Sequence, residues 1–543
     1  MPIVVRNLSL ALDQPEDLLP EAVARKLRVE TTDIRSWAIL RRALDARKKD
    51  IRFVYHVEVA LDEPQRAQRS RISRLHAPDV AWAEPEGSMV PRYGTAPLPN
   101  RPVVIGFGPG GMFAALRLAQ MGYRPLVLER GREVRRRHRD ILQRFYRERD
   151  FDPSSNLLFG EGGAGTYSDG KLYTRVNHPL CRFVLETFYH HGADPQILVD
   201  TRPHLGSDRL PTVCMRIRRK IESLGGEVRF ERHVDDLRVS DRGLTALHVC
   251  GPGLPEGGEW LSVGPTVLSV GHSARDTIRL LAAHGVQIDP KPFQIGVRME
   301  HHQEMVDHWQ YGSAAGHRRL GAAEFHAVAR NAAGEHGDVF SFCMCPGGMI
   351  LPSNESPGLI VTNGASRSQR SGRFANSGLV ITLQPADLGL TALGAIDFQQ
   401  RWERLAFERT EGTYRVPAQR ASDFLVGRPS DGTLETSYPL GGQWTDVRTV
   451  VPDVVTQALL RALPMLDAQF PGLAGPEALV TGPETRASAP FRLTRDTLTR
   501  QAVRTPGLYP VGEGAGYAGG IVSAAVDGIR SADAIVETYA PPR

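Results

Sequence analysis

The stretch 102–129, PVVIGFGPGGMFAALRLAQMGYRPLVLE, constrains the fold of this chain more than any other part of it. An apolar run leads into a turn that contains Gly106, Gly108 and Gly111. A helical pattern follows, and a second apolar run ends on Glu129. The pattern predicts a strand–turn–helix–strand unit, in which glycines permit a tight turn and let a ligand approach the backbone closely. The helix N-terminus would offer free N–H groups and a partial positive charge to phosphates.

Glu129 lies roughly 20 residues after the glycine turn, where a carboxylate can hydrogen-bond both ribose hydroxyls of a dinucleotide. Its charge disfavours a ribose 2′-phosphate, so we do not expect NADP at this site. The alternative is a glycine turn inside an ordinary α/β unit. A lone glycine motif could not decide between the two, but here the strand, the helix and the acidic residue are all present. We therefore predict a dinucleotide site.

The composition is that of a globular protein. The chain has 543 residues, of which 41% are hydrophobic and 23% charged, and this length predicts three or four domain-sized units. No apolar run approaches the roughly 18 residues of a membrane span, so none is expected. The N-terminus turns acidic too early for a secretory signal, and we expect a cytoplasmic location by default. Five cysteines in a chain this long do not make a disulfide framework.

The first 60 residues predict a small separate unit. Residues 3–10 and 51–59 alternate like strands, and two helical patterns, 16–27 and 32–47, lie between them. We expect a β-α-α-β module here. Residues 61–100 are polar and rich in proline, and we interpret them as a linker.

Two basic segments allow two interpretations. One contains Arg41, Arg42 and Lys48, and the other is the arginine-rich helical pattern 130–149. They could attract RNA, a docking partner or an acidic substrate. The interpretation we favour is a solvated helix end and an exposed helix with many ion pairs. The net charge of +5 does not establish a nucleic-acid partner.

A second glycine-rich element, 506–528, lies near the C-terminus. An apolar strand ends in Gly512-Glu513-Gly514, and a helix rich in small residues begins at Ile521. The element resembles the strand–Gly–acid–Gly–helix element of flavoproteins of the glutathione-reductase type. In those proteins the acid usually holds the ribityl chain of FAD and the helix N-terminus faces the flavin. Glu513 is similar to that acid, although Asp is the commoner residue.

Two further segments carry glycines. The stretch 159–172, FGEGGAGTYSDGKL, has too many for a helix interior, so we expect a loop against a ring or a phosphate, with a surface loop as the alternative. The stretch 266–276 is an apolar strand that ends in Gly271-His272-Ser273. In flavoproteins of this type, a strand ending in Ala-Thr-Gly returns to FAD at this point.

Together these elements resemble a known family, the uncharacterised FAD-dependent dehydrogenases, a bacterial and plastid group of NAD(P)/FAD-type oxidoreductases. The matching segments include VVIGFGPGGMFAALRLA, FGEGGAGTYSDGKL, GHSARDT, KPFQIGVRMEH, FCMCPGGMI, TNGASRSQR, PETRASAPFRLTRD and GEGAGYAGGI. The resemblance implies FAD and a two-domain flavoprotein core, but no substrate. It also implies that Glu484, Thr485 and Arg486 approach the flavin.

The two glycine-rich elements lie at opposite ends of the chain and must meet on one FAD. We therefore expect an α/β and α+β fold, in which a discontinuous Rossmann-like FAD-binding domain holds an inserted mixed-sheet substrate domain. The expected division is 1–95 for the N-terminal module and linker, 96–285 and 476–543 for the FAD-binding domain, and 286–475 for the insertion.

The candidate site residues follow from these motifs. Expected FAD contacts are Gly106, Gly108, Pro109, Gly110, Gly111, Glu129, Arg130, Gly162, Gly163, Gly165, Ser168, Gly271, Gly512, Glu513, Gly520 and Ile521. Candidate catalytic residues are His272, Cys343 and Cys345. The two cysteines would share one face of a strand and could form a redox pair, although packed core cysteines are the alternative. No HxxxH or CxxC spacing is present, so we expect no metal.

The expected function is flavin-dependent redox catalysis on a small-molecule substrate. No second glycine motif with an acidic partner is visible, so NAD(P)H, if it is the electron donor, would dock transiently. The alternatives are a flavoprotein that binds or modifies RNA through its basic N-terminal module, and a scaffold stabilised by flavin without turnover.

Overall fold

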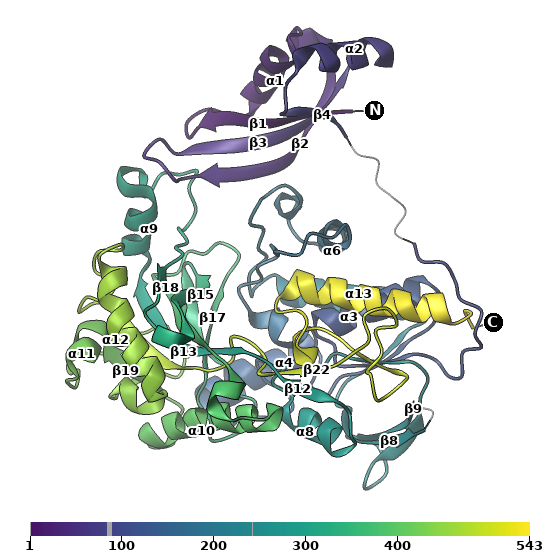
Figure 1. Cartoon of the computed structure of the whole chain (residues 1–543), viewed down its shortest axis with the longest axis vertical. Helices are drawn as coiled ribbons and strands as arrows, with labels where there is room; N and C mark the ends of the chain where they lie inside the picture. The colour runs from purple at the N-terminus through teal and green to yellow at the C-terminus, as the bar shows by residue number, and fades with distance from the viewer. Residues whose placement is uncertain (1, 84–89, 242, 543) are drawn as a thin grey trace.

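The structure, a computed structural model, describes residues 2–83, 90–241 and 243–542. An N-terminal module lies at the top of Figure 1, above a larger body whose two lobes lie side by side. One lobe contains the parallel sheet with α3 (Pro109–Gln120) and α13 (Ile521–Thr538), and the other contains a mixed sheet. No helix within the described ranges is long and apolar enough to cross a membrane.

The N-terminal module is a four-stranded sheet, and the expected helix at 32–47 is wrong. That segment forms β2 (Ile34–Asp45), which pairs antiparallel with β3 (Arg52–Leu61) along its whole length, with two register shifts. Both faces of β2 are largely exposed, so its sequence lacks the strict alternation that marks a half-buried strand. Pairing with a strong neighbouring strand therefore outweighed a weak helical pattern.

The expected linker also contains part of this module. Two elements follow β3, namely α2 (Gln65–Leu75) and β4 (Val80–Trp82), and β4 pairs with β1 (Ile3–Ala11). The sheet order is β2-β3-β1-β4, and α1 (Leu19–Leu27) packs on β1. The module is thus β-α-β-β-α-β rather than β-α-α-β.

A parallel five-stranded sheet forms the centre of one lobe. Its order is β23 (Leu508–Pro510), β11 (Thr266–Leu268), β5 (Val103–Ile105), β6 (Leu126–Leu128) and β7 (Glu227–Arg229). The strands come from both ends of the chain. The helices α3 and α13 lie against each other, and a Cβ at Gly528 would come within 2.0 Å of the Gly110 carbonyl oxygen. Only glycine allows this close approach.

A seven-stranded mixed sheet forms the centre of the other lobe. Its order is β14 (Val328–Ala329), β15 (Val339–Cys345), β18 (Phe374–Leu383), β13 (Phe293–His302), β21 (Leu479–Glu484), β19 (Val416–Arg420) and β20 (Gly442–Trp444). Because β21 pairs with β13 and β19, this sheet extends past residue 475, where we expected the insertion to end. The helices α9 (Gln303–Tyr311), α10 (Ala392–Arg409), α11 (Ala421–Val426) and α12 (Asp453–Asp467) belong to this lobe.

The remaining elements are smaller. An antiparallel sheet has the order β10 (Glu259–Ser262), β9 (Gly243–Cys250), β8 (His233–Ser240). Two strand pairs are β12 (Ile288–Pro290) with β22 (Phe491–Leu493), and β16 (Gly348–Pro352) with β17 (Thr362–Ser366). The other helices are α4 (Val134–Arg139), α5 (Tyr146–Glu148), α6 (Leu180–His190), α7 (Leu210–Ser223) and α8 (Arg275–Ala283).

Candidate functional site

A cavity of about 320 Å³ lies at the carboxyl ends of the parallel strands, where the chain leaves β5, β6, β11 and β23. In this sheet β5 is the point at which the strand order reverses, since β6 follows on one side and β11 lies on the other. Ligands of open α/β sheets bind at such a point. The cavity also reaches β15 of the mixed sheet and β17 of the small strand pair β16–β17.

The cavity wall brings together most of the expected site residues from widely separated segments of the chain. They are Gly106, Gly108, Pro109, Gly110, Glu129, Arg130, Gly163, Gly165, Ser168, Gly271, His272, Cys343, Gly512, Glu513, Gly520 and Ile521. Gly111, Gly162 and Cys345 do not line it. A Cβ at Gly111 would lie 2.0 Å from the Gly106 carbonyl oxygen, and one at Gly162 would lie 1.9 Å from the Thr166 hydroxyl. These two glycines therefore permit close packing behind the wall.

The first turn of α3 is open to the cavity. Gly108 is the N-cap of α3, and a Cβ placed there would meet no atom nearer than the Gly163 Cα, at 3.9 Å. The helix start, where the first N–H groups have no partner within the helix, thus has open space beside Gly108. A phosphate group needs this combination of free N–H groups and room, so the site fits a dinucleotide.

Glu129 is buried and already holds three backbone groups. Its Oε2 accepts a hydrogen bond from the Phe107 N–H (2.7 Å), and its Oε1 accepts from Gly131 and Gly160 (2.9 Å each). The carboxylate therefore joins the ends of β5 and β6 to the glycine-rich loop. Because each carboxylate oxygen can accept two hydrogen bonds, Oε2 keeps capacity for a ligand hydroxyl.

Arg137 holds the glycine-rich loop in place from α4. It is fully buried and donates to three backbone carbonyls, those of Asn156 (2.8 Å), Glu161 (2.8 Å) and Gly163 (2.9 Å). Gly163 lines the cavity, so Arg137 positions one wall of the site. The sequence analysis favoured an exposed helix for this arginine, and its complete burial contradicts that interpretation.

Other arginines of the basic segments are paired. Arg132 contacts Asp140 (2.7 Å), and Arg136 contacts Glu231 (2.8 Å). In the N-terminal module, Arg42 pairs with Asp200 at 2.8 Å, a contact that joins the module to the body. The pairs of Arg132 and Arg136 match the interpretation of an ion-paired segment at 130–149. Arg42 lies on β2, so the interpretation of its segment as a solvated helix end is wrong.

Glu513 lies at the start of the 3₁₀ turn that precedes α13. Its Oε1 accepts a hydrogen bond from the Ala489 N–H at 2.9 Å. Burial raises the pKa of its carboxyl above the usual value, opposed by the Ala489 hydrogen bond and the Lys291 charge. The residue thus joins the C-terminal glycine element to the chain that returns from the mixed sheet.

His272 is a neutral imidazole on the cavity wall. Burial, together with the charges of Arg486 and Arg275, lowers its pKa to about 3. Within the described ranges, no group hydrogen-bonds its buried Nε2 atom. A buried polar atom without a partner costs free energy, and a ligand in the cavity could supply the missing hydrogen bond.

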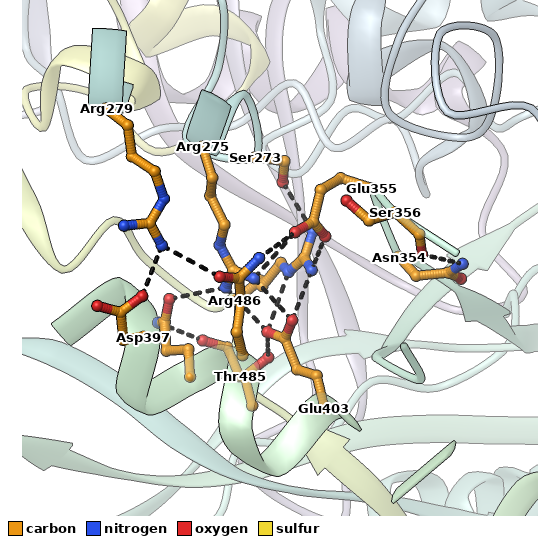
Figure 2. A network of polar contacts seen from close by, with 12 residues as sticks. Ser273, Arg275, Arg279, Asn354, Glu355, Ser356, Asp397, Glu403, Thr485 and Arg486 are labelled. Atoms are coloured by element: carbon orange, nitrogen blue, oxygen red, sulfur yellow. Dashed lines mark hydrogen bonds and ion pairs between the residues drawn. The ribbon is translucent and has the colours of Figure 1, made fainter. Parts of the chain in front are cut away.

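Beside His272 lies a buried network of charges, shown in Figure 2. Glu403 of α10 accepts from Arg275 at 2.7 and 2.9 Å and from Arg486 at 2.8 and 3.3 Å. Glu355 accepts from both arginines as well. Arg486 lines the cavity and donates to the Ser273 hydroxyl at 3.3 Å. The network therefore links the cavity segment 271–273 to the mixed-sheet lobe.

Glu403 is ionised within this network. Burial alone would raise its pKa, but Arg275 and Arg486 outweigh burial and hold the pKa well below its usual range. The two arginines balance the charges of Glu403 and Glu355, so the buried network is formally neutral. Such pairing makes buried charge tolerable.

Cys343 lines the cavity, whereas Cys345 does not. The strand pairing of β15 with β18 shifts between Phe342 and Cys345, and Cys343 has a φ of +44°. The strand is therefore irregular at Cys343, and the two cysteine side chains do not share one face as they would on a regular strand. Arg298, which forms a fully buried pair with Glu484 (2.6 Å), also donates to the Cys343 carbonyl at 3.4 Å.

The surroundings of Cys343 favour its thiolate. A hydrogen bond from Cys345 lowers the pKa of Cys343, with burial opposing and the Lys171 and Arg298 charges assisting. The pKa of Cys345 is raised well above its usual value by the same interaction. A thiol with a lowered pKa at a cavity wall is a candidate reactive group.

Several wall residues carried no signal in the sequence. Examples are Ser353 from the mixed-sheet lobe and His233 from the parallel-sheet lobe. They stand outside recognisable motifs and reach the cavity only because distant segments fold together.

Two family models match the chain. Residues 292–487 match the model "FAD-dependent protein, C-terminal domain-like", and residues 2–60 match a domain of unknown function. An uncharacterised protein of Clostridium beijerinckii is 39% identical over 547 residues, covering 100% of both chains. The chain therefore belongs to the family of that protein, a family of FAD-dependent proteins. It is a flavoprotein whose cofactor is FAD.

Solved structures of several enzymes also show similarity to this chain. The L-proline dehydrogenase from P. horikoshii is 10% identical, with 81% of this chain and 94% of that chain covered and a TM-score of 0.35. The glycine oxidase from Geobacillus kaustophilus is 12% identical, with 82% and 95% covered and a TM-score of 0.35. A mutant of the halogenase PltM in complex with FAD is 11% identical, with 82% and 71% covered and a TM-score of 0.36.

Proposed function

We propose that this flavoprotein is an oxidoreductase that exchanges a hydride or an electron pair with a small-molecule substrate in the cavity described above. The observation that carries the proposal is the cavity wall. It joins an open helix N-terminus and both glycine-rich elements to two groups suited to chemistry, the neutral His272 and the acidic thiol of Cys343.

The residues that would hold FAD follow from their positions. The start of α3 at Gly108 would bind the pyrophosphate, because there is open space beside this glycine and a helix N-terminus offers N–H groups to phosphates. Glu129 Oε2 would accept from a ribose hydroxyl, and Glu513 with the N-terminus of α13 would complete the site. Bound FAD supplies two-electron redox chemistry, usually through its N5 atom.

Two side chains would act on the substrate. The Nε2 atom of His272 would hold or move a substrate proton, since the imidazole stays neutral at pH 7 and the atom has no partner among the described residues. The thiolate of Cys343 would place a negative charge or a nucleophile on the part of the wall that comes from the mixed sheet.

The proposed division of the chain is a FAD-binding domain built from both chain segments around the parallel sheet, with the mixed sheet as an inserted substrate-side domain. The pairing of β21 moves the end of the insertion to about residue 487, where the family model also ends. NAD(P)H is the candidate electron donor, and it would dock transiently at this cavity.

The proposal is tested by mixing the purified protein with NADH or NADPH in the absence of oxygen. We expect the flavin absorption to bleach with one of them. If neither bleaches it, NAD(P)H is not the donor. Replacing His272 by Asn should then slow reduction by substrate while the flavin absorption spectrum and content stay the same. An unchanged rate would remove His272 from the mechanism.

The RNA alternative predicts salt-dependent binding of tRNA through the basic N-terminal module. Its support is weaker, because Arg42 is held by Asp200 and Glu16. The absence of tRNA binding at low salt would dismiss this alternative.

A further inference from the structure

The small sheet of β8, β9 and β10 lies at the edge of the parallel-sheet lobe, where Figure 1 labels β8 and β9. One of its faces is buried in an apolar core through Val234, Leu237, Leu247 and Val249. Side chains alternate along a strand, so His248 and Cys250 of β9 face the other side, away from this core.

A β-bulge brings a third polar residue to the same place. Val234 pairs with Val249 and Asp236 with His248, which leaves Asp235 as the extra residue of β8. Bulges redirect side chains in this way. The exposed carboxylate of Asp235 thereby reaches the two side chains of β9.

The three side chains converge on one point. The His248 Nδ1 lies 2.7 Å from Asp235 Oδ1, and the Cys250 thiol donates to Asp235 Oδ2 at 2.9 Å. The Cys250 Sγ and His248 Nδ1 are 3.9 Å apart. All the candidate ligand atoms lie within 4.8 Å of one another.

These distances suit a single metal ion. Zinc bonds of about 2.0 Å to nitrogen or oxygen and about 2.3 Å to sulfur place neighbouring ligands of a tetrahedron roughly 3.3–3.7 Å apart. The observed separations of 2.7, 2.9 and 3.9 Å between the three side chains lie on both sides of that range. Thiolate, imidazole and carboxylate together are a ligand set for zinc or a similar divalent transition metal rather than for magnesium or calcium.

We propose that Asp235, His248 and Cys250 form a second site, separate from the flavin cavity, that binds one Zn²⁺-type divalent ion, with water as the fourth ligand. In the metal-free state, Cys250 and His248 are joined to the Asp235 carboxylate by hydrogen bonds. Metal binding replaces the protons of these hydrogen bonds. The fourth, open position makes the site accessible from solvent.

The surroundings support a formed site rather than a chance encounter of surface groups. The Trp260 ring packs against the His248 ring at 5.0 Å. A Cβ at Gly258 would lie 2.8 Å from both the Cys250 Sγ and the His248 ring, so the β10 side closes over the two ligands.

The sequence did not indicate this site, because its ligands lack the short spacings that mark zinc motifs. Only the bulge in β8, together with strand pairing, makes Asp235 a neighbour of the two β9 residues. The expectation of no metal rested on spacing alone.

The test uses the full-length, FAD-loaded protein after reduction of its thiols and removal of metals with a chelator. Titration with Co²⁺ should produce thiolate-to-metal charge-transfer and tetrahedral d–d absorption bands that saturate at one equivalent. Added Zn²⁺ should abolish these bands. Metal analysis after desalting should find one zinc per chain.

Two variants and two controls decide the outcome. Cys250→Ser should remove the charge-transfer band. His248→Gln should weaken Zn²⁺ binding by more than about 100-fold, since losing even an outer-shell partner costs about 10–100-fold. Cys181→Ser alters another partly exposed cysteine, and Asp236→Asn alters the adjacent pair with His284 (2.7 Å). Both controls should bind like the parent protein.

Absence of a saturating one-equivalent signal would overturn the proposal, as would equal affinity in the Cys250→Ser and parent proteins. Circular dichroism and flavin content would verify that each variant is folded. Since these readouts are independent of turnover, failure here would leave the proposed oxidoreductase function untouched.

Discussion

Glu403 provides a strong test of the buried charge network, because it is the common acceptor of two arginines. Replacing it with Gln removes one negative charge and leaves Arg275 and Arg486 with Glu355 alone. The carboxylate also accepts from the Thr485 hydroxyl at 2.6 Å, and Glu403 itself has no solvent exposure. The variant thus buries one uncompensated positive charge.

Breaking a buried pair by removing one partner costs about 3–5 kcal/mol. In a unit the size of the mixed-sheet lobe, each 1 kcal/mol lowers the melting temperature by about 2–4 °C. We therefore expect Glu403→Gln to lower the melting temperature by about 6 °C or more. Differential scanning calorimetry of the FAD-loaded protein would measure the change, and Glu408→Gln, at an exposed position of the same helix, is the matched control.

The pH dependence has a definite sign. Because the folded-state pKa of Glu403 is lowered, its contribution to stability is fully present above the unfolded-state pKa of about 4.5. The contribution is lost as the pH falls towards the folded-state pKa. The gap between the parent and Glu403→Gln proteins should therefore be constant near neutral pH.

A double variant separates charge imbalance from lost packing. Arg275→Met with Glu403→Leu removes one charge of each sign and leaves Arg486 paired with Glu355. Since replacing a whole buried pair by apolar groups is often nearly neutral, the double variant should melt above the single one. A single-variant loss below about 1 kcal/mol, or a double variant that melts lower, would refute the reasoning.

Three further predictions concern the cavity. Gly108→Val should abolish FAD binding, because the valine side chain would fill the open space that the pyrophosphate of FAD is proposed to occupy. Far-UV circular dichroism should stay native, and retention of flavin by the variant would contradict this prediction. Alkylation of Cys343 by iodoacetamide should reach its midpoint at a lower pH than alkylation of Cys181, because a hydrogen bond from Cys345 lowers the pKa of Cys343, whereas burial raises the pKa of Cys181. Peptide mass spectrometry would separate the two cysteines, and equal midpoints would disprove a stabilised thiolate. Arg137→Gln should lower the melting temperature and weaken FAD binding, because it strands buried carbonyls at about 1–3 kcal/mol each; a variant with parental flavin affinity would show that Arg137 does not position the loop.

Local signals in the sequence were enough to predict the strands and helices around the proposed FAD site. The run into Gly106, the helix after Gly108 and the strand ending at Glu129 appear in the structure where the pattern predicted them. The same holds for the strand before Gly512 and the helix from Ile521. These elements combine short hydrophobic runs with glycines whose conformation is set locally, so neighbouring residues suffice to predict them.

Tertiary structure decided what depends on pairing between distant segments. The segment 32–47 became a strand because β3 offered it a partner, against its own helical pattern. Cys343 reached the cavity and Cys345 did not, because a register shift turned the strand between them. Glu403 found two arginines from other elements, and a bulge turned Asp235 towards Cys250. Such contacts depend on chain segments far apart in the sequence, and local propensity carries no information about them.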